Sequence, residues 1–136
     1  MDDCLFCKIA AGEIPSMKVL ETDGAFAFLD IHPLSDGHTV VVPKAHSSDI
    51  TGLPDSDLLP LFSAVREVVA RLRLKLGVEH FTIGINHGTA AGQLVEHVHV
   101  HVIPRSTGDG GSSLHGVLPK GTAREPLENI LKRITL

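Results

Sequence analysis

An alternating run of histidine and valine is the feature of this chain most suited to chemistry. The run is His97-Val98-His99-Val100-His101-Val102, followed by Ile103-Pro104. Successive side chains of an extended strand point to opposite faces, so we expect the three imidazoles on one face and the valines on the other. Imidazole is the usual acid–base group near neutral pH, a nucleophile toward phosphorus or acyl carbon, and a common metal ligand. The run therefore predicts a catalytic or a metal-binding strand whose second face packs in the core.

Strand geometry disfavours one metal shared by all three histidines. Positions i and i+4 of a strand lie ~13 Å apart, whereas a metal lies ~2 Å from each ligating nitrogen. Two alternate histidines could still share a metal, and the spacing favours catalysis only slightly over that site. An exposed strand face that carries histidine without a use is the weaker alternative, because the spacing is regular and the opposite face is uniformly valine.

Residues 87–93, immediately before the histidine strand, form a loop in which most side chains are small. Such a loop can present backbone N–H groups to an anionic transition state. A histidine nucleophile beside this loop would be suited to transfer at phosphorus.

Two cysteines form a C-x-x-C pair, Cys4-Leu5-Phe6-Cys7. A redox pair, half of a zinc site and two structural thiols are all consistent with this spacing. No predicted strand precedes the pair and the chain has no second C-x-x-C, which disfavours a thioredoxin-like role. If the pair holds zinc, the other ligands have to come from the nine histidines.

Hydrophobic periodicity predicts the elements that would position these residues. We expect an α+β fold, with an antiparallel sheet, one long helix and smaller helices. The expected strands cover residues 17–21, 25–30, 38–42, 81–86 and 95–103. The expected long helix runs from Leu58 to Leu76, capped by Asp55 or Ser56 and ended by Gly77. A flexible loop at 106–113 and a short helix at 126–134 complete the chain.

Length and composition favour one domain over residues 1–136. The formal net charge of −4 argues against a broad surface for nucleic acids or anionic membranes, and the absence of Trp and Tyr argues against base stacking on aromatic rings. The N-terminus resembles no secretory signal, and no segment approaches the ~20 apolar residues of a membrane helix. We expect a cytoplasmic protein.

Taken together, these motifs resemble the histidine triad (HIT) family, whose signature alternates three histidines with apolar residues. The likeness extends over nearly the whole chain and is greatest to the compact bacterial and archaeal branch related to the Hint proteins. It rests on His97–Ile103 and on further matching segments, namely Cys4–Ile9, Gly12–Pro15, Phe28–Ile31, Pro33, Gly37-His38, Val42–Lys44, His46, Asn86, Gly92-Gln93 and Pro104-Arg105.

The resemblance implies a mechanism at the α-phosphate of a nucleoside phosphoramidate, an aminoacyl-adenylate or a dinucleoside polyphosphate. His99 would attack phosphorus and form a covalent nucleotidyl-histidine, and water would then release a nucleoside monophosphate. His101 and His38 would contact the phosphate. The other implied contacts are Asp30 to the ribose hydroxyls, the backbone of Gly92, Gln93 and Leu94 to the phosphoryl oxygens, the side chains of Asn86 and Gln93 to the substrate, and Ile9, Phe26 and Ile31 as walls of the base pocket.

The resemblance also implies a structural zinc ion and a dimer. The matching zinc ligands are Cys4, Cys7, His46 and His97, a closed Cys₂His₂ set. The HIT-like fold implied is a five-stranded antiparallel sheet that continues across a homodimer, where the long helix and a strand of each subunit meet.

One position departs from the family pattern. Eukaryotic Hint members carry a serine after the glutamine, thought to protonate the leaving amine, whereas this chain has Leu94. Leucine has no proton to give, and Glu96 is a weak substitute because strand alternation places it on the valine face.

The leading function is a nucleotide hydrolase or, with phosphate as acceptor, a nucleotidyl transferase, because His38, His99 and His101 are all present. The alternatives are a weakly catalytic or non-catalytic purine-nucleotide-binding regulator with a structural zinc, and a zinc-dependent partner-binding protein.

Overall fold

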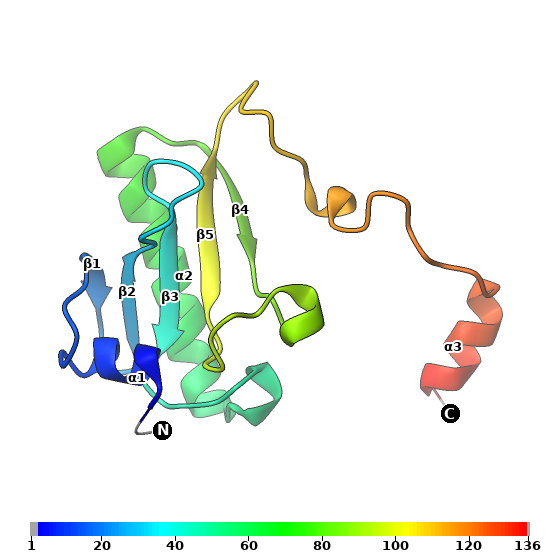
Figure 1. Ribbon diagram of the computed structural model, residues 1–136, viewed down its shortest axis with the longest axis horizontal. Coiled ribbons are helices and arrows are strands. Elements are labelled where there is room, and N and C mark those ends of the chain that lie inside the picture. The colour runs from blue at the N-terminus through cyan, green and yellow to red at the C-terminus, as the bar shows by residue number, and fades with distance from the viewer. Residues whose placement is uncertain (1–2, 136) are drawn as a thin grey trace.

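The protein, described here by a computed structural model over residues 3–135, is built on a five-stranded antiparallel sheet (Figure 1). The sheet order is β1-β2-β3-β5-β4, so β1 and β4 are its edges. The strands are β1 (Lys18–Glu21), β2 (Ala25–Leu29), β3 (Thr39–Pro43), β4 (His80–Gly84) and β5 (Val100–Arg105). The predicted antiparallel five-stranded sheet is confirmed.

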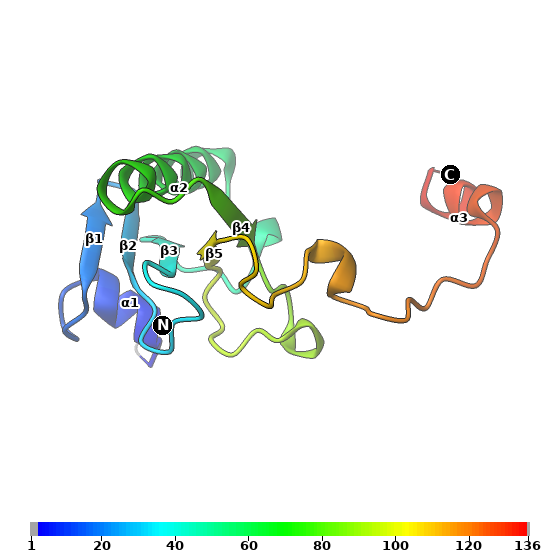
Figure 2. The same ribbon diagram turned by 90° about the horizontal axis from the view of Figure 1, so that it is seen from above.

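Helices cover the two faces of the sheet. The long helix α2 (Asp55–Leu76) lies on one face and the short helix α1 (Leu5–Ala10) on the other, as Figure 2 shows from above. Strand alternation divides the core accordingly. Val41, Val100 and Val102 pack under α2, whereas Phe28 and Val40 pack with α1. The sheet is thus a partition between two apolar layers, and the histidines lie on the α1 side.

The boundaries of α2 depart from the sequence prediction at one end only. The helix begins at Asp55, and Pro54 occupies the N-cap without a side-chain hydrogen bond, so the predicted cap by Asp55 or Ser56 is wrong. Proline is tolerated here because the first N–H groups of a helix have no intrahelical acceptor, so its missing N–H leaves no hydrogen bond unmade. The C-terminal end is confirmed: Gly77 adopts a left-handed φ of 68° and its N–H donates to the Arg73 carbonyl at 3.1 Å.

The histidine strand is shorter than predicted. Pairing begins at Val100 rather than at residue 95, because residues 95–99 leave the sheet and the Val98 N–H donates to the Ser47 carbonyl instead. Alternation nevertheless continues through this segment. Val98 joins the core under α2, while His97 and His99 lie against the Phe6 ring on the opposite face.

The C-terminal tail extends away from the sheet beyond β4 (Figures 1 and 2). It contains a 3₁₀ turn (Leu114–Gly116) and the helix α3 (Leu127–Thr135), which confirms the predicted short helix. Two further 3₁₀ turns lie at Ile50–Gly52 and Thr89–Ala91. Within residues 3–135, no helix combines the length and apolarity needed to cross a bilayer.

Candidate active site and metal centre

His99 lies immediately before β5 with one ring nitrogen committed to the backbone. Its Nδ1 lies 2.8 Å from the His97 carbonyl oxygen, which can only accept a hydrogen bond, so the neutral ring carries its proton on Nδ1. The lone pair is then on Nε2. The buried ring is held edge-on by Phe6, with ring centroids 5.0 Å apart and planes at 85°. This arrangement leaves the Nε2 lone pair free on an oriented imidazole, the form in which a histidine can act as a nucleophile.

His38 and His101 form a proton-ordered chain beside His99. The Leu34 N–H donates to His38 Nδ1 at 3.1 Å, so neutral His38 carries its proton on Nε2. His38 Nε2 then donates to His101 Nδ1 at 2.9 Å, which leaves the proton of neutral His101 on its own Nε2. The His101 ring lies 5.1 Å from the His99 ring between centroids. An N–H donor on His101 therefore lies beside the His99 ring, whose Nε2 lone pair is free.

Burial keeps this pair neutral. Desolvation lowers the pKa of His38, and the Asp30 carboxylate acts in the opposite direction. Desolvation likewise lowers the pKa of His101, reinforced by His99 and His38 and again opposed by Asp30. Asp30 Oδ2 lies 3.6 Å from His38 Nε2 and 3.9 Å from His101 Nδ1. The carboxylate thus contributes the only negative charge within 4 Å of the pair among the described residues.

An apolar cavity of about 250 Å³ opens beside this cluster, between α1 and the end of β2. Phe6 lines it and also packs on His99, while Asp30 lies at its polar end. The full lining is Leu5, Phe6, Ile9, Ile14, Pro15, Ser16, Met17, Phe28, Leu29, Asp30, Ile31 and Val40. A flat apolar group could occupy this cavity while a hydroxyl-bearing group reaches the carboxylate.

Two of the three predicted walls of a base pocket line the cavity. Ile9 and Ile31 do so, but Phe26 does not: its ring lies in the core beneath, 6.2 Å from that of Phe28. Phe26 and Phe28 share a face of β2, and Phe28, being nearer the end of the strand, lines the cavity. Phe6, in contrast, was not singled out from the sequence. Its place within the C-x-x-C pair was the available signal.

The loop at 87–93, before the histidine strand, is held by more hydrogen bonds than its sequence suggests. The Gln93 side chain accepts from the Gly88 N–H at 2.8 Å and donates to the Ser48 and Val95 carbonyls, so it holds the loop rather than facing outward. The N–H groups of Gly92 and Gln93 donate within the same turn. Among the three expected phosphoryl donors, the Leu94 N–H alone has no recorded acceptor in the described part of the chain.

Asn86 and Leu94, two of the predicted substrate-binding residues, lie exposed beside this loop. Gly92 has φ of 101°, which favours glycine, and a Cβ there would lie 3.7 Å from the Asn86 amide nitrogen. Asn86 therefore lies over Gly92, exposed at the end of the segment after β4. Leu94 is 94% exposed and presents only aliphatic carbon to the solvent.

A second cluster brings together the four predicted metal ligands. One ligating atom from each of Cys4, Cys7, His46 and His97 lies within 4.8 Å of all the others. His97 Nδ1 lies 3.4 Å from Cys4 Sγ and 3.5 Å from Cys7 Sγ, and His46 Nδ1 lies 3.4 Å from Cys7 Sγ. Tetrahedral zinc with ordinary bond lengths requires sulfur–nitrogen separations of about 3.5 Å.

Hydrogen bonding prepares His97 for a cation. Its Nε2 donates to the Pro43 carbonyl at 2.8 Å, so the lone pair of the neutral ring is on Nδ1, among the sulfurs. The ring is fully buried, and burial lowers the pKa of His97. Burial, followed by the Cys4 thiol, raises the pKa of Cys7. A bound cation would compensate both thiolates, so this donor set fits zinc.

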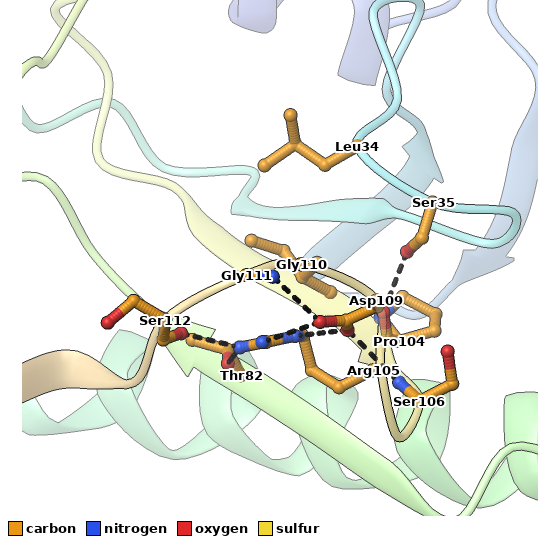
Figure 3. Close-up of a pocket in the computed structure, with 11 residues that line it drawn as sticks. Leu34, Ser35, Thr82, Pro104, Arg105, Ser106, Asp109, Gly110, Gly111 and Ser112 are labelled. Carbon is orange, nitrogen blue, oxygen red and sulfur yellow. Dashed lines mark hydrogen bonds and ion pairs between the residues drawn. The ribbon is translucent and has the colours of Figure 1, made fainter. Parts of the chain in front are cut away.

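A larger cavity, about 390 Å³, lies far along β5 around Arg105 (Figure 3). The Arg105 guanidinium pairs with the Asp109 carboxylate at 2.7 and 3.0 Å and donates to Thr82 Oγ1 and the Ser112 carbonyl. Arg105 holds the pKa of Asp109 far below its usual range. This network ties the loop at 106–113, which the sequence predicts to be flexible, to β4 and the end of β5.

Comparison with known proteins identifies the family. A model of the HIT domain matches residues 11–108. An uncharacterized HIT-like protein of Methanocaldococcus jannaschii is 48% identical over 107 residues, covering 79% of this chain and 82% of its own. An adenosine 5′-monophosphoramidase of Schizosaccharomyces pombe is 40% identical over 111 residues, covering 79% and 78%.

Solved structures agree with the fold. A HIT family member from Bacillus subtilis is similar with a TM-score of 0.82 at 38% identity, covering 97% of this chain and 94% of its own. A zinc-bound histidine triad family protein from Mycobacterium smegmatis has a TM-score of 0.76 at 36% identity, covering 82% and 81%. The signature run, the fold and these relatives lead to one conclusion: the chain belongs to the HIT family.

Proposed function

We propose that the protein hydrolyses a nucleotide at its α-phosphate through a covalent intermediate on His99. One observation carries the proposal: His99 Nδ1 is bonded to the His97 carbonyl, which leaves the Nε2 lone pair free beside the proton-ordered pair His38–His101. The apolar cavity that ends at Asp30 supports a nucleoside as the bound group. The phosphoramidase relative supports the same class of substrate.

The reaction takes place in two displacements at phosphorus. In the first, the His99 Nε2 lone pair forms a bond to the α-phosphorus and the bond to the leaving group breaks, with the leaving group taking up a proton from solvent. In the second, water attacks phosphorus and gives up a proton to solvent, the nitrogen–phosphorus bond breaks, and a nucleoside monophosphate leaves. Phosphate in place of water would yield a nucleoside diphosphate, which is the transferase variant.

The neighbouring residues would stabilise the charge that develops. The His101 Nε2–H and the Leu94 N–H would donate to phosphoryl oxygens, and His38 would hold the His101 tautomer. Asp30 would accept from the paired ribose hydroxyls. Leu94 cannot act as the acid for the leaving group, so good leaving groups such as acyl-phosphate or pyrophosphate esters should react faster than simple amines.

We also propose that zinc occupies the Cys4–Cys7–His46–His97 cluster in a structural role. The three ligand separations of 3.4–3.5 Å and the Nε2 bond of His97 to Pro43 support this metal. With four protein ligands, the ion would have no open position for substrate. Bound zinc would supply a cross-link between α1 and the segment that precedes β5.

We further propose a two-fold homodimer formed along β4. This edge strand exposes Ile83, at 41%, and α2 exposes Phe62, at 46%. Exposed backbone N–H and C=O groups at a sheet edge favour pairing with another strand. Pairing of the two β4 edges would produce the continuous sheet expected for the family.

A substrate panel with purified protein tests the reaction. The panel compares adenosine and guanosine 5′-phosphoramidates, an aminoacyl-adenylate mimic and diadenosine polyphosphates, each with water or phosphate as acceptor. We expect nucleoside monophosphate as product, and a rise in intact mass equal to one nucleotidyl group when the reaction is quenched in the steady state. Binding of AMP without turnover would favour a regulatory nucleotide-binding protein instead. Absence of both would contradict the assignment of the site.

A further inference from the structure

Two cavities flank the histidines on the face of the sheet that α1 covers. The apolar cavity at Asp30 lies over the end of β2, where Phe28 lines it. The cavity around Arg105, called the Arg105 cavity below, lies over β5 and β4, where Ile103 and Thr82 line it. The sheet order β2-β3-β5-β4 places the histidines of β5 between the two cavities. A substrate with its nucleoside in the first cavity and its α-phosphate at the histidines would therefore extend toward the second.

The Arg105 cavity begins next to His101. Ile103, two residues further along β5, lies on the same strand face at ~7 Å along the chain. Directly opposite partners in a sheet share a face, and here Thr82 is paired with Ile103 and Gly84 with His101. A Cβ at Gly84 would meet no atom within 4 Å. The strand face beside His101 is therefore open toward the cavity.

Leu34 connects the cavity with the proton-ordered pair. Its N–H donates to His38 Nδ1 at 3.1 Å, while the residue also lines the Arg105 cavity. The next residue, Ser35, fixes this segment to the end of β5, since its hydroxyl donates to the Pro104 carbonyl at 2.8 Å. Figure 3 shows Leu34 and Ser35 on one side of the cavity and the loop at 109–112 on the other. Leu34 is 76% exposed and thus presents carbon surface beside the catalytic pair.

The opposite wall of the cavity carries charges that neutralise each other. Arg105 and Asp109 are the two charged residues among the described residues that line it, and they are paired at 2.7 and 3.0 Å. The loop approaches so closely that a Cβ at Gly111 would lie 2.6 Å from Arg105 Nη2. The lining therefore combines the aliphatic side chains of Leu34 and Ile103 with an ion pair of no net charge.

Such a lining discriminates between leaving groups. Burial of an apolar group is favourable, whereas burial of a charge without a partner is costly. A polyphosphate leaving group carries several negative charges, and the guanidinium of Arg105 is already bound to Asp109. An uncharged acyl or amine group would fill the cavity at no such cost.

We propose that the Arg105 cavity is the leaving-group subsite and that it selects nucleotides whose leaving group has an uncharged apolar body. This inference rests on the hydrolase function proposed above and names its substrate class. The loop at 106–113 would then determine specificity, because Asp109 holds the charge of Arg105 neutral. Recognition of the leaving group is separate from its chemical reactivity, so leaving groups of equal basicity are needed to measure it.

A second cavity, beside Leu94, would give the opposite preference. It measures about 410 Å³ and is lined by two acids, Asp3 and Glu96. A leaving group bound there would be favoured by a positive charge. The charge of the preferred leaving group therefore tells the two cavities apart.

Four adenosine 5′-phosphoramidates test the proposal with the full-length protein. Their leaving amines are ammonia, benzylamine, 4-(aminomethyl)benzoate and 4-(aminomethyl)benzylamine, which add an apolar, an anionic and a cationic body in turn. Ammonia and benzylamine are nearly equal in basicity, so the ratio of their kcat/KM values reports recognition. We expect the benzylamine substrate to exceed each of the others by at least about tenfold, as burial of an apolar ring would produce.

The outcomes separate this inference from the proposed function. Turnover of the ammonia substrate without a preference for benzylamine, or with a preference for the anionic body, would overturn the subsite alone. Preference for the cationic body would assign the leaving group to the cavity beside Leu94. Absence of turnover with all four substrates would overturn the proposed hydrolase function as well.

Two variants at one position test whether the preference comes from the Arg105 cavity. Thr82→Leu fills part of the cavity, whereas Thr82→Val keeps the volume of threonine. Both lose the hydroxyl that accepts from Arg105, so they differ in volume. We expect the benzylamine-to-ammonia ratio of kcat/KM to be about tenfold lower in T82L than in T82V. Equal ratios in the two variants would place the apolar body outside this cavity.

A change of charge gives a second, independent test. Asp109→Asn keeps the size of the side chain and leaves the Arg105 charge without its carboxylate partner. We expect the ratio of kcat/KM for the anionic body to that for benzylamine to rise about tenfold. Glu67→Gln removes a carboxylate from α2, on the other face of the sheet, and should leave this ratio at the wild-type value. A ratio that is the same in D109N and E67Q would overturn the proposal.

Discussion

Two histidine clusters lie on the α1 side of the sheet in this protein, and their hydrogen bonds suit them to different functions. In one, His97 uses Nε2 to donate to the Pro43 carbonyl, so its lone pair is directed at Cys4 and Cys7. In the other, His38 accepts a backbone N–H on Nδ1 and donates from Nε2 to His101. A metal ligand needs a free lone pair, which His97 has and His38 lacks.

The comparison explains why Asp30, His38 and His101 are not a second metal site, although their ligating atoms also lie within 4.8 Å of one another. A metal on His38 Nε2 would displace the proton that the Leu34 N–H contact assigns to that atom, and would require an imidazolate. The cluster is instead arranged to hold protons. Residue type is thus shared by both clusters, and the tautomer distinguishes them.

The largest effect is expected where the free lone pair acts as nucleophile. His99→Ala should lower kcat/KM for a nucleoside phosphoramidate by at least about 10³-fold, because no other group can form the intermediate. Steady-state kinetics, with circular dichroism and AMP titration as checks on folding and binding, measure this. His80→Ala, at an exposed position on β4, is the control and should keep wild-type rates. Turnover by H99A within tenfold of wild type would exclude His99 as nucleophile.

The metal cluster should affect stability more than chemistry. Replacing both Cys4 and Cys7 with Ser should remove about one zinc per chain and about 3 kcal/mol or more from the free energy of unfolding, since a tightly bound ion stabilises only the folded state. Metal analysis and denaturant unfolding measure the two quantities. Turnover per folded molecule should fall less than tenfold. A native protein purified without chelators and found free of metal would contradict the zinc assignment.

The proton-ordered pair should show the reverse pattern. His38→Asn should lower kcat about 10- to 100-fold, because His101 loses the donor that sets its tautomer. The zinc content of this variant should equal that of wild type. The two sets of variants should therefore differ in opposite ways: the cysteine variants lose zinc and retain most of their turnover, whereas H38N loses turnover and retains zinc. Loss of metal in H38N would show that the clusters are not independent.

The smallest effect concerns pH. Burial lowers the folded-state pKa of His38 and His101 below the ordinary value of 6.5, so the unfolded chain takes up protons first as the pH falls. Their contribution to stability is complete above pH 6.5 and decreases below it, by less than about 1.4 kcal/mol per pH unit for each histidine. Denaturant unfolding between pH 7.5 and 5.5, as test conditions, measures this slope. The free energy of unfolding of H38N should depend less steeply on pH than that of wild type.

Much of the fold follows from local patterns in the sequence. The Val98-Val100-Val102 alternation, the helical spacing of α2 and the helix-ending Gly77 were each sufficient, because they depend on neighbours within a few residues. Helix α1 was not predicted, since its six residues form a helix through the cap by Cys4 and through packing of Phe6 and Ile9 on the sheet. Short elements of this kind depend on tertiary contacts.

The candidate site, too, could be predicted from the sequence only in part. Spacing along one strand disfavoured a metal shared by all three histidines. Resemblance separated the role of His97 from that of His99 and supplied the four metal ligands that the structure brings together. The single-domain expectation for residues 1–136 and the catalytic roles stay predictions. The structure gives the Gln93 side chain hydrogen bonds to the Gly88 N–H and the Ser48 carbonyl, so its amide holds the loop in place. No pattern of residue types could indicate these partners.

The sequence by itself determined which side chains are available and on which face of the strand each would lie, because strand periodicity is a property of the backbone. Only the tertiary structure decided what each imidazole can do. The partners that assign the protons are the carbonyls of Pro43 and His97 and the N–H of Leu34; Pro43 lies 54 residues from its partner His97, whereas the other two lie within four residues of theirs. Backbone groups are identical at every residue, so folding alone selects which of them meets a given ring nitrogen.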